Sequence, residues 1–215
     1  MIKALVWDLD GTLLNTIDDL ADSVNFALSK YNLPNKTVAE VKNAVGSGVA
    51  LLIARCINKG SENPNFAEIL RTFKGHYSKN SAVKTAPYPK ITEILKTLKE
   101  RGYKLAVVSN KFENAVSELC QKYFPNTFDI VIGETAQIKR KPAPDMLYKA
   151  LEMLKVKKNE IYFIGDSEVD IQTANNAEVK CLSALWGFRS KEILLANGAK
   201  NFLNTPQEIF GYLIK

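Results

Sequence analysis

The sequence predicts an α/β fold, a Rossmann-like doubly wound parallel sheet with a helical domain inserted near its amino terminus. Short apolar runs rich in β-branched residues alternate with segments of helical period along most of the chain. Residues 15–82 interrupt this alternation, because they contain helical patterns and no clear strand. A chain of 215 residues is long enough to bury a core in the sheet and to carry the insertion.

Five apolar runs have the length and composition of buried parallel strands. We expect strands at Ile2–Trp7, Leu105–Val108, Ile130–Ile132, Ile161–Ile164 and Cys181–Leu185. The segments between them have the spacing of apolar residues that an amphipathic helix requires. We expect these helices at Ile91–Arg101, Glu113–Tyr123, Pro144–Leu154 and Asp170–Asn176.

The inserted stretch carries four helical patterns. They span Asp18–Tyr31, Val38–Val45, Val49–Asn58 and Phe66–Tyr77. The chain then runs through Pro87 and Pro89, which favour an extended return segment. The expected division is therefore a core of residues 1–14 and 83–215 and a helical domain of residues 15–82.

The composition restricts the class of partner. The net charge is +6 and the pI is about 9.1, but the basic residues are spread along the chain, and 139–141 is their only run of three. This pattern favours small anionic substrates over nucleic acid. The first apolar run is too short for a signal peptide and no stretch approaches the ~18–20 apolar residues of a membrane span, so we expect no membrane partner and a cytoplasmic location.

Two carboxylates follow the first expected strand. Asp8 and Asp10 are two positions apart in an extended segment, so their side chains share a face. Gly11 and Thr12 let the chain turn there, with its backbone N–H groups exposed. Because ligands of open α/β sheets bind at the carboxyl ends of strands, this turn suits both a divalent cation and a phosphate group.

Other strand ends bring further polar groups to the same edge. Ser109 and Asn110 follow the second strand, Lys141 lies after the third, and Asp166 and Asp170 follow the fourth. A lone Asp-x-Asp-Gly segment is most often a turn with solvated aspartates. Four strand ends that deliver acids, a hydroxyl and a lysine to one edge predict a site instead, because core packing does not require them.

Four ordered motifs carry a resemblance to a known family. They are Asp8-Leu9-Asp10-Gly11-Thr12-Leu13, Ser109-Asn110-Lys111, Lys141-Pro142-Ala143-Pro144-Asp145 and Gly165-Asp166-Ser167-x-x-Asp170. Together they resemble the haloacid dehalogenase (HAD) superfamily, and the insertion after the first motif resembles the cap of its phosphoglycolate phosphatase branch. Trp186-Gly187-Phe188 resembles a late motif of that branch.

The segment Val45-Gly46-Ser47-Gly48, with the following helix that ends near Arg55, resembles the cap loop of the same branch. The resemblance implies that Gly46, Ser47, Gly48 and Arg55 contact substrate. The residues themselves are equally consistent with a plain link between two helices and an arginine on the cap surface.

The resemblance implies a Mg²⁺-dependent phosphatase that hydrolyses a small organic phosphomonoester through an aspartyl-phosphate. Asp8 would be the nucleophile and a metal ligand, with Asp166 as a second ligand and the Asp10 backbone carbonyl as a third. The Asp10 carboxyl group would act as general acid and then as general base. Asp170 would either ligate the metal or orient its waters and Lys141.

The same analogy gives the groups that hold the phosphoryl oxygens. They are the Ser109 hydroxyl, the Asn110 N–H, the Lys141 ammonium and the turn amides at Gly11 and Thr12. The expected partner is a small phosphorylated molecule, and both a monomer and a homodimer remain open.

Several other functions share parts of this pattern. A phosphotransferase or mutase of the β-phosphoglucomutase kind, a pyrophosphatase and a nucleotidase use the same core. Asp10 argues against a dehalogenase, because that branch lacks the second aspartate of the first motif. A receiver-like signalling domain lacks the long insertion, and a silent binding protein would not need every ionisable group of the mechanism.

Overall fold

A computed structural model describes residues 1–213 of the chain. The chain divides into two compact units. Residues 1–14 and the chain from Pro87 onward form the first, which we call the α/β unit. Asn15–Ala86 form the second, which we call the helical unit.

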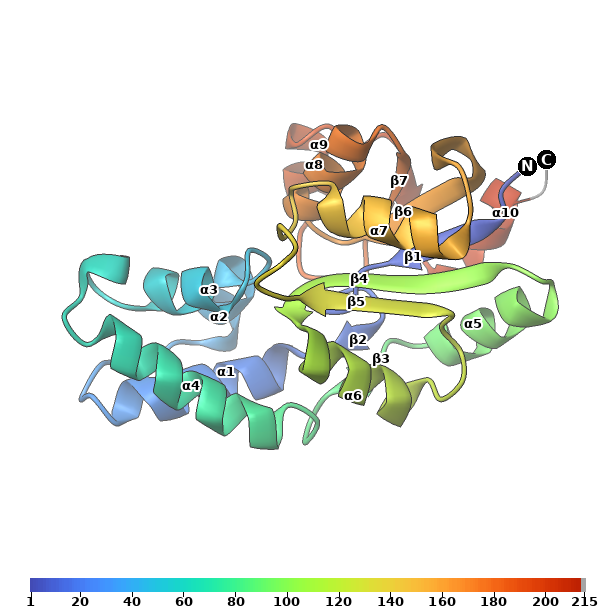
Figure 1. The fold of residues 1–215 in the computed structure, drawn as a ribbon. Helices are drawn as coiled ribbons and strands as arrows, with labels where there is room; N and C mark the ends of the chain where they lie inside the picture. The colour runs from blue at the N-terminus through green and yellow to red at the C-terminus, as the bar shows by residue number, and fades with distance from the viewer. Residues whose placement is uncertain (214–215) are drawn as a thin grey trace. The chain divides into compact units, whose positions relative to one another are not determined.

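A six-stranded sheet forms the centre of the α/β unit (Figure 1). Its order is β5-β4-β1-β6-β7-β8, and every pairing in it is parallel. The strands are β1 (Ala4–Trp7), β4 (Lys104–Phe112), β5 (Ile130–Glu134), β6 (Ile161–Gly165), β7 (Lys180–Ala184) and β8 (Phe202–Leu203). The predicted parallel α/β fold is confirmed, and all five predicted strands are present.

Helices cover both faces of this sheet. On one face, α7 (Asp145–Leu154) and α8 (Glu168–Ala177) bury apolar side chains against β1, β4 and β6. On the other lie α5 (Ile91–Glu100) and α6 (Glu113–Tyr123) (Figure 1). All four helices lie where the sequence predicted them.

Some elements of the α/β unit were not predicted. The short strand β8 and the helices α9 (Lys191–Ala196) and α10 (Ile209–Leu213) span too few residues to show a period in the sequence. The strand β4 also continues four residues beyond its expected end at Val108. Its pairing with β5 shifts register between Val108 and Phe112, so the polar residues there belong to the strand.

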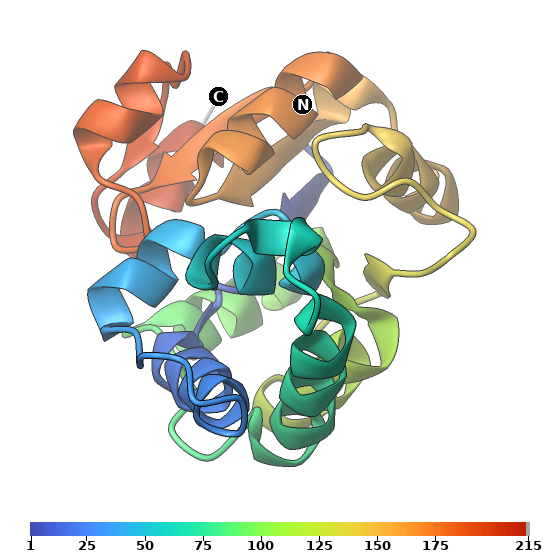
Figure 2. The same ribbon diagram turned by 90° about the vertical axis from the view of Figure 1, so that its left-hand side faces the viewer.

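The helical unit contains four α-helices, and α1 lies alongside α4 (Figure 2). They are α1 (Ile17–Ser29), α2 (Val38–Ala44), α3 (Val49–Cys56) and α4 (Phe66–Asn80). Thr37 begins α2 with a capping box, in which its hydroxyl accepts the Glu40 N–H at 3.2 Å and the Glu40 carboxylate accepts the Thr37 N–H at 2.8 Å. Each of the four helical patterns found in the sequence corresponds to one of these helices.

Buried Asp19 holds the last residues of the helical unit in place. Its carboxylate accepts the backbone N–H groups of Val83, Lys84 and Thr85 at 3.1, 2.9 and 2.8 Å. These bonds tie residues 83–85 to α1, whereas the sequence placed the boundary before residue 83. Two short strands, β2 (Leu14–Asn15) and β3 (Ala86–Pro87), pair where the chain passes between the units.

Among the described residues, no helix is both long and apolar enough to cross a membrane. The three cysteines are free thiols, and Cys56 and Cys120 are buried while Cys181 is partly buried. The cytoplasmic location stays a prediction.

Candidate active site

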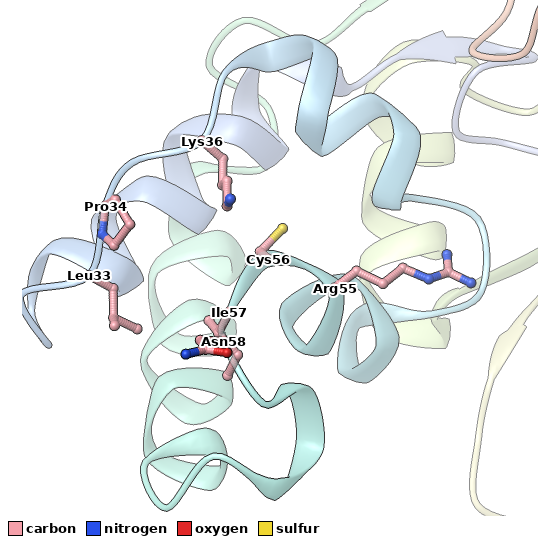
Figure 3. A pocket seen from close by; sticks show the side chains of 7 residues that line it. All are labelled: Leu33, Pro34, Lys36, Arg55, Cys56, Ile57 and Asn58. Atoms are coloured by element: carbon pink, nitrogen blue, oxygen red, sulfur yellow. The ribbon is translucent and has the colours of Figure 1, made fainter.

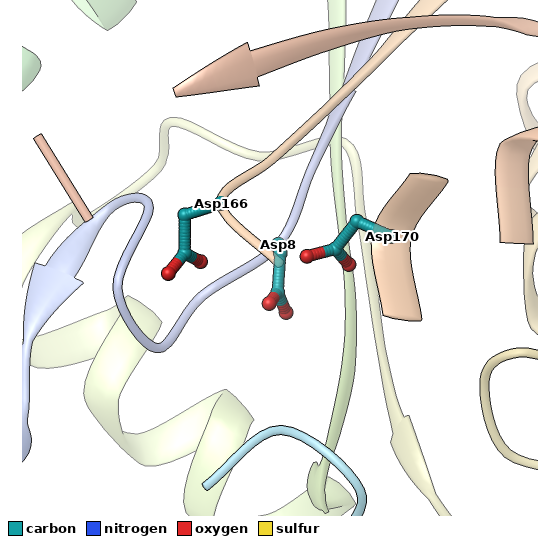
Figure 4. Close-up of side chains that lie close together, drawn as sticks. All are labelled: Asp8, Asp166 and Asp170. Atoms are coloured by element: carbon teal, nitrogen blue, oxygen red, sulfur yellow. The ribbon is translucent and has the colours of Figure 1, made fainter. Parts of the chain in front are cut away.

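Three carboxylates converge at the carboxyl edge of the sheet. Asp8 follows β1, Asp166 follows β6, and Asp170 lies in the first turn of α8. One oxygen from each lies within 4.8 Å of the others, and all three residues are buried. Figure 4 shows Asp8 between the other two side chains, with the Asp170 carboxylate directed toward it. The paired strands β1 and β6 therefore place this cluster.

Two glycines leave room for these carboxylates. A Cβ atom at Gly11 would lie closer than 3.0 Å to the carboxylate of Asp166, and one at Gly165 would lie as close to Asp170. Gly11 also has a φ of 84°, a left-handed conformation that side chains disfavour. The glycines of the first and last motifs are thus explained by the space that the acidic cluster occupies.

Lys141 is the cation of the cluster. Its Nζ lies 2.9 Å from Oδ1 of Asp8 and 2.7 Å from Oδ1 of Asp170, and its side chain is buried. Burial by itself lowers the pKa of Lys141, but Asp170 and Asp8 outweigh it and raise that pKa above its ordinary value. The lysine therefore keeps its charge and offsets part of the negative charge of the cluster.

One ammonium group does not balance three carboxylates. Burial, opposed by Lys141 and reinforced by Asp170 and Asp10, raises the pKa of Asp8 to about 7. Burial together with Asp170 and Asp8 raises the pKa of Asp166 to about 8, against hydrogen bonds from Phe188 and Thr12. A further cation would favour the ionised form of both groups. A set of buried carboxylate oxygens suits a hard divalent ion such as Mg²⁺, so the residues fit the expected metal.

Asp10 has a partner that the sequence did not reveal. The Nζ of Lys111 lies 2.9 Å and 3.0 Å from the two carboxylate oxygens of Asp10, and the lysine is buried. Lys111 lies in the last residues of β4, which extends through Phe112 and shifts register with β5 after Val108. The sequence analysis missed this pairing because it expected the strand to end before Ser109.

The residues of the second motif have distinct contacts. The Asn110 side chain donates to the Lys141 carbonyl at 2.9 Å and accepts the Lys141 N–H at 2.8 Å. It therefore fixes the backbone that presents the lysine. The Ser109 hydroxyl accepts the Lys111 N–H at 3.3 Å. Both Ser109 and Asn110 are buried beside the residues that the sequence placed with them.

The turn after β1 uses its own polar groups. The Gly11 N–H donates to the Leu14 carbonyl at 2.9 Å and the Thr12 N–H to the Leu9 carbonyl at 3.3 Å. The Thr12 hydroxyl donates to Oδ1 of Asp166 at 2.9 Å. These groups therefore hold the turn and orient a carboxylate, and the contact of Gly11 and Thr12 with phosphate stays a prediction.

The expected cap residues all lie in the helical unit. Gly46, Ser47 and Gly48 form the loop between α2 and α3, and both glycines have positive φ. The Arg55 guanidinium donates to the Ala44 carbonyl at 2.9 Å and to the Ser47 hydroxyl at 3.5 Å. Arg55 therefore braces the loop itself.

A cavity of about 320 Å³ opens in the same unit. It is lined by Leu33, Pro34, Lys36, Arg55, Cys56, Ile57 and Asn58 (Figure 3). The Arg55 side chain extends away from the other lining residues, toward its loop partners (Figure 3).

A buried acidic cluster beside a lysine, at the carboxyl edge of a parallel sheet, is the arrangement of an enzyme active site that binds a charged ligand. Residues 5–184 match the model of the haloacid dehalogenase-like hydrolases. The chain belongs to this family, as its four motifs predicted.

Named relatives are phosphatases. A phosphoglycolate phosphatase of Aquifex aeolicus (strain VF5) is 32% identical over 188 residues, which cover 87% of this chain and 86% of that protein. A second phosphoglycolate phosphatase, from Haemophilus influenzae (strain 86-028NP), is 32% identical over 194 residues. The match covers 86% of this chain and 87% of that protein. The predicted class, a phosphoric monoester hydrolase similar to phosphoglycolate phosphatases, is confirmed.

Solved structures agree with this placement. A crystal structure of a provisionally assigned phosphoglycolate phosphatase from Lactobacillus delbrueckii subsp. bulgaricus has a TM-score of 0.94 and 35% identity, and the match covers 98% of both chains. CbbY from Rhodobacter sphaeroides, solved in complex with phosphate, has a TM-score of 0.76 and 25% identity over 95% of each chain.

Proposed function

We propose that this phosphatase is Mg²⁺-dependent and hydrolyses a small organic phosphomonoester, such as 2-phosphoglycolate, through an aspartyl-phosphate on Asp8. The observation that carries the proposal is the burial of Asp8, Asp166 and Asp170 around Lys141 at the strand ends. A carboxylate there can act as a nucleophile only if its repulsion with an anionic substrate is cancelled. At 4 Å and an effective dielectric near 20, that repulsion is about 4 kcal/mol per pair of unit charges.

The residues that would hold Mg²⁺ are Asp8, Asp166 and the backbone carbonyl of Asp10, with Asp170 beside Lys141 as a further ligand or as a group that orients water. When bound, the ion supplies the positive charge that lets the phosphate dianion approach the Asp8 carboxylate. The buried ammonium of Lys141 adds a second charge of the same sign at 2.9 Å from Asp8.

In the first step, an Asp8 carboxylate oxygen forms a bond to phosphorus while the bond from phosphorus to the alkoxide oxygen breaks. Asp10 delivers its proton to that departing oxygen, so the product leaves as an alcohol. In the second step, Asp10 takes a proton from water, whose oxygen bonds to phosphorus, and the bond to Asp8 breaks. Phosphate leaves, and both aspartates return to their starting forms.

The groups that bind the transferring phosphoryl oxygens are proposed to be the Ser109 hydroxyl, the Asn110 N–H and the Lys141 ammonium. Lys141 is rigidly presented, because the Asn110 side chain bonds both its N–H and its carbonyl. Donors that are fixed before the reaction stabilise developing charge without further ordering.

The substrate class rests on the relatives named phosphoglycolate phosphatase. We infer that the helical unit serves as a cap, with Gly46, Ser47 and Gly48 contributing to substrate selection. Arg55 would act through its bond to the Ala44 carbonyl, which braces that loop. A small carboxylated or sugar phosphate fits the basic charge of the chain, which is +6.

The test is phosphate release from 2-phosphoglycolate, sugar phosphates, nucleotides and pyrophosphate, with Mg²⁺ and with a chelator. We expect Mg²⁺-dependent release that is fastest for a small phosphomonoester, and a loss of roughly a thousandfold or more in Asp8→Asn, because the nucleophile is removed. The matched control is Asp22→Asn, which changes an exposed aspartate of α1. Full activity in Asp8→Asn, or in the presence of a chelator, would contradict the proposal.

A further inference from the structure

A segment after β7 packs against the acidic cluster. The N–H of Phe188 donates to Oδ2 of Asp166 at 2.7 Å, and the indole N–H of Trp186 donates to the Thr12 carbonyl at 3.0 Å. Since the Thr12 hydroxyl donates to Oδ1 of the same aspartate at 2.9 Å, each carboxylate oxygen of Asp166 has its own donor. The carboxylate is therefore held at both oxygens, from two different loops.

Gly187 stands between these two donors. A Cβ atom built there would lie closer than 3.0 Å to Cβ of Asp166 and to the carbonyl oxygen of Gly11. The backbone of the segment thus lies directly on the metal-site aspartate and on the turn that follows β1. Only a residue without a side chain permits this approach.

Arg189 anchors the far end of the segment. Its Nε lies 2.8 Å from Oε2 of Glu168 and its Nη2 lies 3.3 Å from Oε1, so the guanidinium contacts both carboxylate oxygens. Arg189 is buried, and Glu168 is the first residue of α8, the helix that carries Asp170. The segment is therefore fastened to elements that supply each of the three acidic residues.

We propose that Trp186–Arg189 is a positioning segment that sets the affinity of the site for Mg²⁺, by fixing the Asp166 carboxylate and the turn after β1. The inference rests on the proposed function, since it assumes that the acidic cluster holds the ion. Residues that orient metal ligands through hydrogen bonds typically alter metal affinity by about 10–100-fold when they are changed.

The first test is Gly187→Ala, with Mg²⁺ binding to the metal-free protein measured by calorimetry and by the shift in Tm that Mg²⁺ produces. We expect Mg²⁺ binding to weaken by about 10–100-fold, because the new methyl group must push Asp166 or the turn aside. The matched control is Gly75→Ala at an exposed position of α4, where an added Cβ meets nothing within 4 Å. The control should bind Mg²⁺ as the wild type does.

The second test is Trp186→Phe, which removes the indole N–H and keeps an aromatic ring. We expect Trp186→Phe to bind Mg²⁺ more weakly than the wild type, with a smaller loss than in Gly187→Ala. If Gly187→Ala does not fold, Trp186→Phe tests the positioning role. A purely structural segment would lower Tm equally with and without Mg²⁺ and leave the dissociation constant unchanged.

The outcomes separate the inference from the proposed function. Wild-type affinity for Mg²⁺ in folded Gly187→Ala, or in Trp186→Phe where Gly187→Ala does not fold, overturns the positioning role alone. A wild-type protein that binds no Mg²⁺ overturns both that role and the proposed metal dependence.

Discussion

Two lysines in the site pair with different carboxylates, so we expect them to have different roles. Lys141 lies between Asp8 and Asp170, where it offsets charge around the proposed nucleophile. Lys111 pairs with Asp10, the proposed acid and base, through both carboxylate oxygens. A bond to both oxygens restrains the rotation of the carboxylate, so Lys111 is expected to act by orienting Asp10.

The loss of kcat/KM in Lys111→Met should therefore depend on the leaving group of the substrate. For alkyl phosphates, which need a proton on the departing oxygen, kcat/KM should fall about 100-fold. For p-nitrophenyl phosphate, whose leaving group departs without a proton, kcat/KM should fall much less. Steady-state kinetics on the two substrates measure this difference.

The control for this prediction is Lys99→Met, which removes a lysine from the half-exposed ion pair with Asp129. Lys111→Arg should recover part of the activity toward alkyl phosphates, because it restores a cation beside Asp10. An equal loss on both substrates in Lys111→Met would argue against an orienting role and for general damage to the site.

Site residues could be predicted from the sequence where both their chemistry and their place at a strand end were evident. Asp8, Lys141, Asp166 and Asp170 follow strands whose ends must meet in a parallel sheet, and the structure brings them together. The pairing of Lys111 with Asp10 depends on how far β4 extends, and apolar periodicity gives no such information for a polar strand end.

Single elements show what local patterns can predict. Helices α5 to α8 each contain two or more turns of apolar repeats, and the sequence predicted all four. Short elements such as β8 and α9 carry no full repeat, so only tertiary contacts reveal them. The end of the helical unit depends on Asp19, whose bonds to residues 83–85 span more than 60 positions in the sequence.

Asp19→Ala should destabilise the protein by about 3 kcal/mol, because three backbone N–H groups lose a charged, buried acceptor. Urea unfolding of the full chain measures the change in the free energy of unfolding. Asp22→Ala is the control on the same helix, since its ion pair with Lys84 is exposed to solvent and contributes little to stability. Equal effects of the two changes would contradict the role assigned to Asp19.

The acidic cluster links the stability of the protein to pH and to the metal. In the metal-free fold the pKa values of Asp8 and Asp166 are raised from 3.8 to about 7 and about 8. A group whose folded pKa is raised stabilises the fold when it is protonated, and this contribution is lost as the pH rises through the folded pKa. The metal-free protein should therefore become less stable between about pH 4 and pH 8.

Mg²⁺ should reverse that loss, because it binds the ionised carboxylates. Thermal unfolding with EDTA and with Mg²⁺ should show a larger increase in Tm from Mg²⁺ at pH 8 than at pH 5. An increase that is independent of pH would indicate that the ion binds elsewhere than at Asp8 and Asp166.

Asp8 is proposed to carry the phosphoryl group, and trapping the covalent form is the strongest test of this role. Asp10→Asn should slow hydrolysis of the aspartyl-phosphate, because the general base is lost. With p-nitrophenyl phosphate as substrate the aspartyl-phosphate should still form, since this leaving group needs no proton from Asp10. After acid quenching, peptide mass spectrometry should find phosphate on the Asp8 peptide with Mg²⁺ present, and none in Asp8→Asn. If the wild type turns over substrate but Asp10→Asn carries no phosphate on that peptide, Asp8 is not the nucleophile.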